Sequence, residues 1–245
     1  MPNASPFSRR HLLGWAGGLT AAAVLGAPLF AAGMLRRPAG PAPTAPIPAP
    51  LIDNPAAGRT SETIVLAGGC FWGIQGVFQH VKGVTAAVSG YAGGRAATAH
   101  YEVVGTGTTG HAESVQITFD PRQVTLGQLL RIFFTVGTDP TQVNQQFPDA
   151  GPQYRSVVFF STPAQKRVAE AYIAQLNAAH VFAAPIATQV TANPGFYAAE
   201  AYHQNYLTLH PTQPYIATYD LPKVEALKRM FPAFYRAQPV LVRAP

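Results

Sequence analysis

Cysteine is nearly absent from this chain of 245 residues, which contains a single one, Cys70. A single cysteine excludes an internal disulfide framework and, by itself, a cysteine-based zinc cluster. Charged residues are also scarce, at 11% of the chain, against roughly 25% in an ordinary soluble domain. Any cysteine chemistry is therefore that of a lone thiol, and an apolar or proline-rich segment must dilute the charge.

Acidic residues are absent from positions 1–50, which hold four arginines and therefore +4 of the net charge of +6. The remaining chain carries only +2 and has no run of lysine and arginine. A nearly neutral body offers no electrostatic surface for a phosphate backbone. We expect no nucleic-acid partner.

The N-terminus has the pattern of an export signal. Arg9 and Arg10 directly precede an apolar stretch, Leu12–Ala32, which has no charged residue. Paired arginines before such a stretch resemble a twin-arginine signal, which predicts an exported, periplasmic protein. The stretch is also near the roughly 20 residues that a membrane-spanning helix needs, and no clear cleavage site follows it. Residues 1–37 are thus a signal or a membrane anchor, and its cleavage stays open.

Proline dominates the next segment, since it occupies six of the thirteen positions of Pro38–Pro50. Proline fixes φ and lacks the amide donor that helices and strands use. We expect residues 38–61 to be a linker outside the fold, residues 62–235 to be the catalytic domain and residues 236–245 to be a tail.

Hydrophobic periodicity predicts an α+β domain from Glu62 onward. Two threonine capping boxes, at Thr125–Gln128 and Thr162–Gln165, open two of the helices. The predicted strands are 63–67, 84–88, 114–119, 156–160 and 186–191, and the predicted helices are 71–81, 125–135, 163–179, 199–209 and 221–231. The β-α-β-β-α-β order predicts a ferredoxin-like two-layer α/β sandwich with extra C-terminal helices.

Cys70 lies between Gly68-Gly69 and the predicted helix, so we expect its thiol at a helix N-terminus, where free amides favour a thiolate. Most free cysteines are merely small buried hydrophobes. Phe71 and Trp72 follow directly, and two large aromatic residues beside the sulfur favour an apolar cage for a small uncharged group.

Seven motifs in order and spacing carry a resemblance. They are 69–73 (GCFWG), 90–94 (GYAGG), 101–104 (YEVV), 110–113 (GHAE), 139–141 (DPT), 149–156 (DAGPQYRS) and 200–207 (EAYHQNYL). Over Glu62–Leu209 the chain resembles the A-type peptide methionine sulfoxide reductases. The resemblance implies an oxidoreductase of protein repair under oxidative stress, acting on the S epimer of methionine sulfoxide, in proteins, in peptides or free.

The resemblance also implies roles for individual residues. Cys70 is the nucleophile, Glu113 is the acid that protonates the sulfoxide oxygen, and the hydroxyls of Tyr101 and Tyr154 donate to that oxygen. The implied substrate-binding residues are Phe71, Trp72, Asp149, His203 and Tyr206. Without the resemblance, each has an ordinary alternative: a solvent-facing glutamate, packing tyrosines, an aspartate turn, and a histidine and tyrosine on an apolar helix stripe.

The chain departs from the family's pattern at three places. Thr138 replaces the common histidine before Asp-Pro, and Gln145–Pro148 replaces an arginine-glutamine-glycine-asparagine stretch, which changes how the substrate backbone is held. Positions 211–245 contain none of the resolving cysteines that many members have. We therefore expect an external thiol to regenerate Cys70, from a thioredoxin-like protein, a glutaredoxin-like protein or glutathione. We expect no cofactor, no metal and a monomer.

Two other classes stay open on the residues alone. A cysteine hydrolase or acyltransferase pairs its thiol with a histidine base, and His80, His100, His111 and His203 are available. A tethered, non-catalytic module would use Phe71 and Trp72 to grip methionine-like groups. An ester probe that acylates Cys70 would indicate the hydrolase, and saturable binding without turnover would indicate the module.

Overall fold

The computed structural model describes residues 43–243. The predicted signal or anchor at 1–37 lies outside these residues, as do the first five residues of the predicted linker. Within 43–243, no helix is both long and apolar enough to cross a membrane.

A six-stranded sheet in the order β7-β6-β1-β3-β2-β8 forms the centre of the fold. The strands are β1 (Glu62–Ala67), β2 (Val84–Ala92), β3 (Ala112–Phe119), β6 (Val157–Phe160), β7 (Gln189–Ala192) and β8 (Phe196–Ala198). Antiparallel pairing joins β6, β1, β3, β2 and β8, whereas β7 runs parallel to β6. The four central strands in the order β6-β1-β3-β2 have the ferredoxin-like arrangement, which confirms the predicted fold class.

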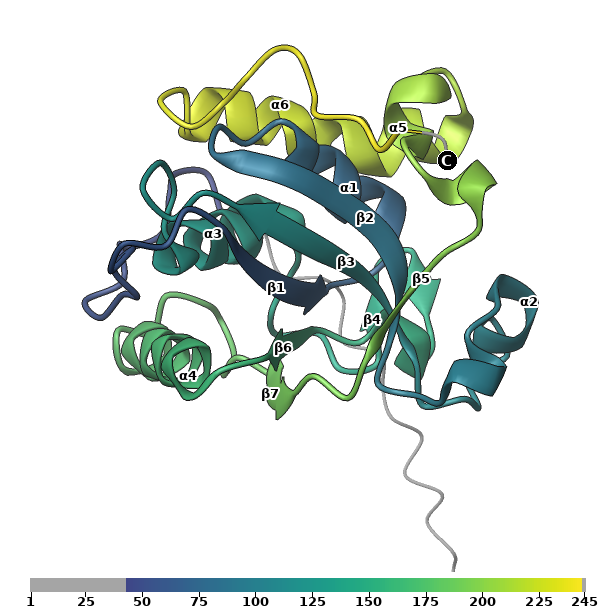
Figure 1. Cartoon of the computed structure of the whole chain (residues 1–245), viewed down its shortest axis with the longest axis horizontal. Coiled ribbons are helices and arrows are strands. Elements are labelled where there is room, and N and C mark those ends of the chain that lie inside the picture. Colours follow the sequence, from purple (N-terminus) through teal and green to yellow (C-terminus); the bar gives the residue numbers. More distant parts are fainter. Residues whose placement is uncertain (1–42, 244–245) are drawn as a thin grey trace, which may run out of the picture. The chain divides into compact units, whose positions relative to one another are not determined.

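Helices pack against the central sheet (Figure 1). The helices are α1 (Phe71–Gln79), α2 (Tyr101–Val104), α3 (Leu126–Ile132), α4 (Pro163–Ala178), α5 (Tyr206–Leu209) and α6 (Leu221–Met230). Short 3₁₀ or π turns are Ala96–Thr98, Phe133–Gly137, Pro152–Tyr154, Ala201–His203 and Ile216–Asp220, and a small hairpin pairs β4 (Gln145–Gln146) with β5 (Asp149–Ala150). The apolar face of α1 buries Ile74, Val77 and Phe78 in the core, and α6 runs alongside α1 on its other side.

The predicted helix at 199–209 is wrong. The chain instead forms a 3₁₀ turn at Ala201–His203 and the short helix α5, because Asn205 between them has a left-handed φ of 59°. The side chain of Gln204 is also used elsewhere, since its Oε1 accepts from Ser89 N at 3.0 Å and its Nε2 donates to Ser89 O at 2.9 Å. These bonds hold the segment against the sheet edge.

Other boundaries shift as well, and the strand predicted at 84–88 extends to Ala92 as β2. The helix predicted at 125–135 ends as α3 at Ile132 and continues as the π turn, where Thr135 Oγ1 donates to Arg131 O at 2.7 Å. The strand predicted at 186–191 begins only at Gln189, because Ile186 N donates to Asn177 Oδ1 of α4.

The proline-rich segment packs on the body, so the linker prediction for 38–61 needs correction from Ile47 onward. Ile47 is 4% exposed, and its carbonyl accepts from Arg131 Nε at 2.7 Å. Tyr172 donates to Pro48 O at 2.6 Å, and Asp53 accepts from Thr125 Oγ1 at 2.5 Å. Prolines lack a donor but keep their carbonyl acceptors, so side chains of α3 and α4 can hold an extended segment without strand pairing.

We expect Ile47→Ala to lower the free energy of unfolding by about 2 to 4 kcal/mol, because it empties a buried site. Leu51→Ala is the matched control, since Leu51 is 86% exposed. Urea unfolding of both variants measures the difference. Equal stabilities would show that this segment does not contribute to the fold.

Candidate active site

Cys70 lies where β1 turns into α1, as the sequence predicts. Gly69 has a φ of 102°, and a Cβ there would lie 2.6 Å from Gln146 Cβ, so both the turn and the space require glycine. Cys70 is the N-cap of α1 and is 9% exposed. The thiol is therefore recessed at the start of the helix.

Glu113 lies beside this thiol. It is on β3, it is 4% exposed, and its Oε2 accepts from Phe71 N at 3.0 Å. Burial raises the pKa of Glu113 to about 8, although the Phe71 amide favours the ionised form; Asp149 and Asp220 raise it further. A carboxyl with this pKa holds a proton at neutral pH, which is the property that the sequence analysis expected of it.

The expected ease of deprotonation of Cys70 is not seen in the resting protein. Burial raises the pKa of the thiol well above its usual value, and the charges of Glu113 and Asp220 act in the same direction. The Trp72 amide at the helix start opposes them. The helix N-terminus is thus outweighed by desolvation, and Cys70 and Glu113 are both protonated at rest.

An aromatic cage adjoins the sulfur. Trp72 stacks on Tyr206 at 3.9 Å between ring centroids and donates from Nε1 to His203 Nδ1 at 3.1 Å. The His203 ring lies 5.0 Å from Phe71 and 4.3 Å from Tyr101. Because His203 Nδ1 accepts, the ring is neutral, and burial lowers its pKa, opposed by Glu200. The structure thus brings these five predicted residues together.

The two predicted tyrosine donors come from short helical segments. Tyr101 begins α2, where its amide donates to Glu200 Oε1, and Tyr154 ends a 3₁₀ turn. Burial raises the pKa of both hydroxyls, to about 12 for Tyr101, and the charge of Glu113 is the next cause for each. Both remain neutral donors close to Glu113.

Asp149 has a partner that the sequence analysis missed. Tyr215 donates its hydroxyl to Asp149 Oδ2, and its ring meets Trp72 edge-on at 6.1 Å. Burial raises the pKa of Asp149, whereas Tyr215 and Lys223 lower it. Tyr215 thus connects the C-terminal segment to the cage.

Asp220 and Lys223 were also missed. Asp220 is fully buried and accepts from Lys223 Nζ at 3.1 Å. A Cβ at Gly73 would lie 2.1 Å from Asp220 Oδ1. The last glycine of the GCFWG motif is therefore required by a residue almost 150 positions away. The one local signal was Asp220 before Leu-Pro, which is typical of a helix start.

The histidines do not pair with the thiol as a hydrolase would require. His203 Nδ1 binds Trp72, His80 Nδ1 contacts Gly76 O, and both ring nitrogens of His111 contact the backbone. His100 is an exposed residue that precedes α2. Among residues 43–243, no group of three or more His, Cys, Asp and Glu side chains has the arrangement of a metal site.

Comparison with known proteins decides the family. The model of one family, described as peptide methionine sulfoxide reductase, matches residues 62–233. The chain belongs to this family. A Mesorhizobium japonicum relative, peptide methionine sulfoxide reductase MsrA 2, is 59% identical over 182 residues, 74% of this chain and 93% of the relative. Its Synechocystis namesake is 48% identical over 195 residues, 78% of this chain and 91% of the relative.

Two solved structures have a similar fold. Reduced Mxr1 from Saccharomyces cerevisiae has a TM-score of 0.57 at 30% identity, covering 66% of this chain and 92% of its own. Methionine sulfoxide reductase A of Corynebacterium diphtheriae has a TM-score of 0.55 at 33% identity, covering 71% and 87%. This reductase is thus an oxidoreductase that reduces methionine sulfoxide with thiols, and neither a hydrolase nor a binding module is favoured.

We expect the buried Glu113 to make stability depend on pH. The folded protein keeps a proton up to about pH 8 that the unfolded chain releases near 4.5. The free energy of unfolding therefore falls as the pH rises between these values. Glu113→Gln cannot ionise, so it should gain stability over the wild type at pH 8, by a few kcal/mol, and much less at pH 5.

Urea unfolding at the two pH values measures this gain. Glu102→Gln is the control, because Glu102 is exposed. A gain for Glu113→Gln that is equal at both pH values would contradict the raised pKa.

Proposed function

We propose that the chain reduces the S epimer of methionine sulfoxide, in oxidised proteins, in peptides or free, through attack of Cys70 Sγ on the substrate sulfur. The observation that carries this proposal is the bond from Phe71 N to Glu113. It holds a carboxyl with a pKa of about 8 next to the residue that bears the thiol. The acid is thus bonded to the amide of the residue that directly follows the nucleophile.

Proton transfer completes the first step. The sulfoxide oxygen cannot leave sulfur as oxide, so Glu113 gives it a proton while Tyr101 and Tyr154 donate hydrogen bonds to it. Cys70 loses its proton as its sulfur bonds to the substrate sulfur, and Glu113 is the base that takes it. The oxygen then moves from the substrate sulfur to Cys70 Sγ. The substrate sulfur–oxygen bond and the new sulfur–sulfur bond break as an Sγ–oxygen bond forms, which gives methionine and a sulfenic acid on Cys70.

The aromatic cage orients the substrate. The half-buried Trp72 presents apolar surface for the methyl group, with the buried ring of Phe71 packed beside it. Tyr206 and His203 hold the indole in place. With the methyl in the cage, the S epimer directs its oxygen toward Glu113 and the two tyrosines. Binding energy from the cage is thereby used to place the oxygen.

An external thiol regenerates Cys70, because the chain has no second cysteine. A thioredoxin-like protein, a glutaredoxin-like protein and glutathione all have the required chemistry. All the residues of the site come from one chain, so a monomer suffices.

We expect Glu113→Gln to lower kcat by about 10²- to 10⁴-fold with little change in KM, because it removes proton delivery rather than binding. The wild-type rate should fall above about pH 8, where Glu113 loses its proton, and the variant should lack that dependence. Methionine formation from a peptide sulfoxide, resolved by epimer, measures both. Glu102→Gln is the control, and a wild-type rate for Glu113→Gln across the pH range would exclude Glu113 as the acid.

We also propose that the protein is exported through the twin-arginine route and stays in the periplasm, free or tethered to the membrane by residues 1–37. The support is Arg9-Arg10 before an uncharged apolar stretch and the proline-rich segment after it. A twin-arginine route accepts folded cargo, which suits a domain that folds without disulfides.

We expect Arg9→Lys combined with Arg10→Lys to trap the activity in the cytoplasm. Cell fractionation followed by an activity assay measures the distribution. Arg36→Lys with Arg37→Lys, which keeps the same charge beyond the apolar stretch, is the control. Normal export of the first double variant would rule out this route.

A further inference from the structure

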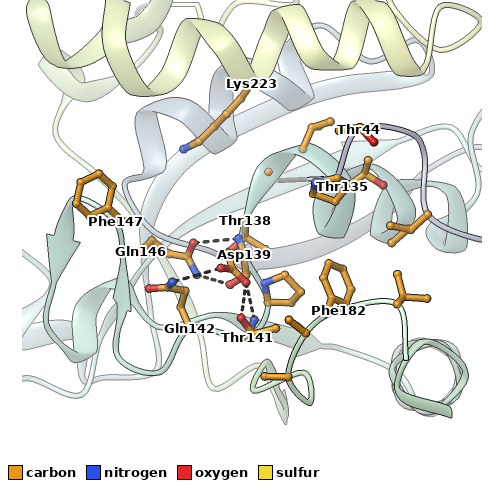
Figure 2. Close-up of a pocket in the computed structure, with 18 of the residues that line it drawn as sticks. Thr44, Thr135, Thr138, Asp139, Thr141, Gln142, Gln146, Phe147, Phe182 and Lys223 are labelled. Carbon is orange, nitrogen blue, oxygen red and sulfur yellow. Dashed lines mark hydrogen bonds between the residues drawn. The ribbon is translucent and has the colours of Figure 1, made fainter. Parts of the chain in front are cut away.

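A cavity of about 700 Å³ leads from Cys70 to the proline-rich N-terminal segment. Its walls come from residues 43–47, the π turn and loop after α3, the β4–β5 hairpin, residues 181–184 after α4, and Tyr215 and Lys223 (Figure 2). The cage residues and the proton donors do not line it: these are Phe71, Trp72, Tyr101, Glu113 and Tyr154. Cys70 is thus the point at which this cavity meets the reaction site.

We propose that the apolar end of this cavity holds an apolar side chain of the substrate polypeptide, from a residue near the methionine sulfoxide. The apolar end consists of the residues of 43–47 and 181–184 that line the cavity, among which Thr44 alone is polar. The inference rests on the proposed function, because it concerns how a peptide or protein lies when its sulfoxide is at Cys70. It makes the enzyme selective for the sequence around the oxidised methionine.

The three groups on the substrate sulfur leave this cavity as the path for the polypeptide. The sulfur of methionine sulfoxide carries an oxygen, a methyl group and the rest of the side chain. With the oxygen toward Glu113 and the methyl group in the aromatic cage, the rest of the side chain leads away from both. The cavity begins at Cys70, excludes the cage and includes Asp149, a residue expected to bind substrate. The substrate backbone therefore lies along the cavity.

The charged residues of the lining are already bonded within the protein, so apolar contact is what the cavity offers. They have these partners: Thr141 donates to Asp139, Tyr215 donates to Asp149, and Lys223 donates to Asp220. A charged substrate side chain would lose its hydration here without gaining a free counter-charge. An apolar side chain gains from leaving water.

One wall of the apolar end lies outside the region that the family model covers. That model matches residues 62–233, whereas residues 43–47 precede it. Ile47 fixes this wall, since it is 4% exposed and its carbonyl accepts from Arg131. Figure 2 shows Thr44 and Phe182 on the same side of the cavity, away from Phe147. The N-terminal segment thus adds to the cavity a surface that the family's own region does not supply.

A phenylalanine scan of the substrate tests this inference on the full-length protein. The substrates are heptapeptides with a central methionine S-sulfoxide, glycine elsewhere, and phenylalanine at one of the three positions on either side. The measured quantity is kcat/KM for methionine formation, which covers only the steps up to methionine release and does not depend on the thiol supply. We expect phenylalanine at one position to raise kcat/KM about tenfold over the all-glycine peptide. Lysine at that position should give no gain.

Two variants place a carboxylate in the apolar end, one from each segment: Ala45→Glu and Ala183→Glu. Both residues line the cavity and are exposed, so the fold should accept the change. In each variant the ratio of kcat/KM for the phenylalanine peptide to that for the glycine peptide should fall from about ten to about one. The lysine peptide should instead become better than the glycine peptide, because its ammonium meets the new carboxylate.

Ala178→Glu is the matched control. Ala178 is exposed on α4 and does not line the cavity, so this variant should keep the wild-type ratios. Ratios between peptides do not depend on the folded fraction of a preparation, so a purely structural effect of a substitution leaves them unchanged.

Equal kcat/KM values for all peptides with the wild type would overturn the inference, as would a phenylalanine preference that both Ala45→Glu and Ala183→Glu retain. A retained preference with slower regeneration by the thiol in these variants would assign the cavity to the reductant instead. Failure of the wild type to release methionine from any of the peptides would reject the proposed function itself, which keeps the two failures distinguishable.

Discussion

Burial of Glu113 beside Cys70 is the constraint on which the site depends. The carboxyl lies on β3, the thiol at the start of α1, and the Phe71 amide joins them. In water this carboxyl would lose its proton well below neutral pH, whereas in the core it keeps it. The same desolvation raises the pKa of Cys70, so the helix N-terminus alone does not activate the thiol. In the mechanism that we propose, activation requires the substrate, whose oxygen receives the proton of Glu113.

The parts of the fold that depend on local pattern could be predicted from the sequence. Alternation located β3, and the threonine box at Thr125–Gln128 forms with both of its hydrogen bonds. At Thr162 only half of the box forms, because Gln165 Oε1 accepts from Ser161 N instead. The helix prediction for 199–209 failed because the side chain of Gln204 binds Ser89 on the distant strand β2. Hydrophobic periodicity gives no information about such a contact.

The residues of the site also fall into two groups, those that the sequence predicts and those that it does not. Cys70, Glu113 and the cage could be predicted because they lie in motifs that resemble a family. Tyr215, Asp220 and Lys223 could not, because they reach the site only when the C-terminal segment folds back onto α1. Gly73 is an example. A side chain at this position would clash with the carboxylate of Asp220, and the spacing within the motif gives no sign of that contact.

The electrostatic balance of the site depends on residues that the C-terminal segment contributes, above all Asp220 and Lys223. Glu113, Asp149 and Asp220 would repel one another and a thiolate if all were ionised, and burial raises the pKa of each. Lys223 favours the ionised forms of Asp149 and Asp220 but is not among the main influences on the pKa of Glu113. The proton therefore remains on Glu113, the carboxyl that we propose as the acid. A positive charge next to Glu113 would lower the pKa of the Cys70 thiol and favour the thiolate. It would also lower the pKa of Glu113, which would then be ionised at neutral pH, and the substrate oxygen would have no proton with which to leave.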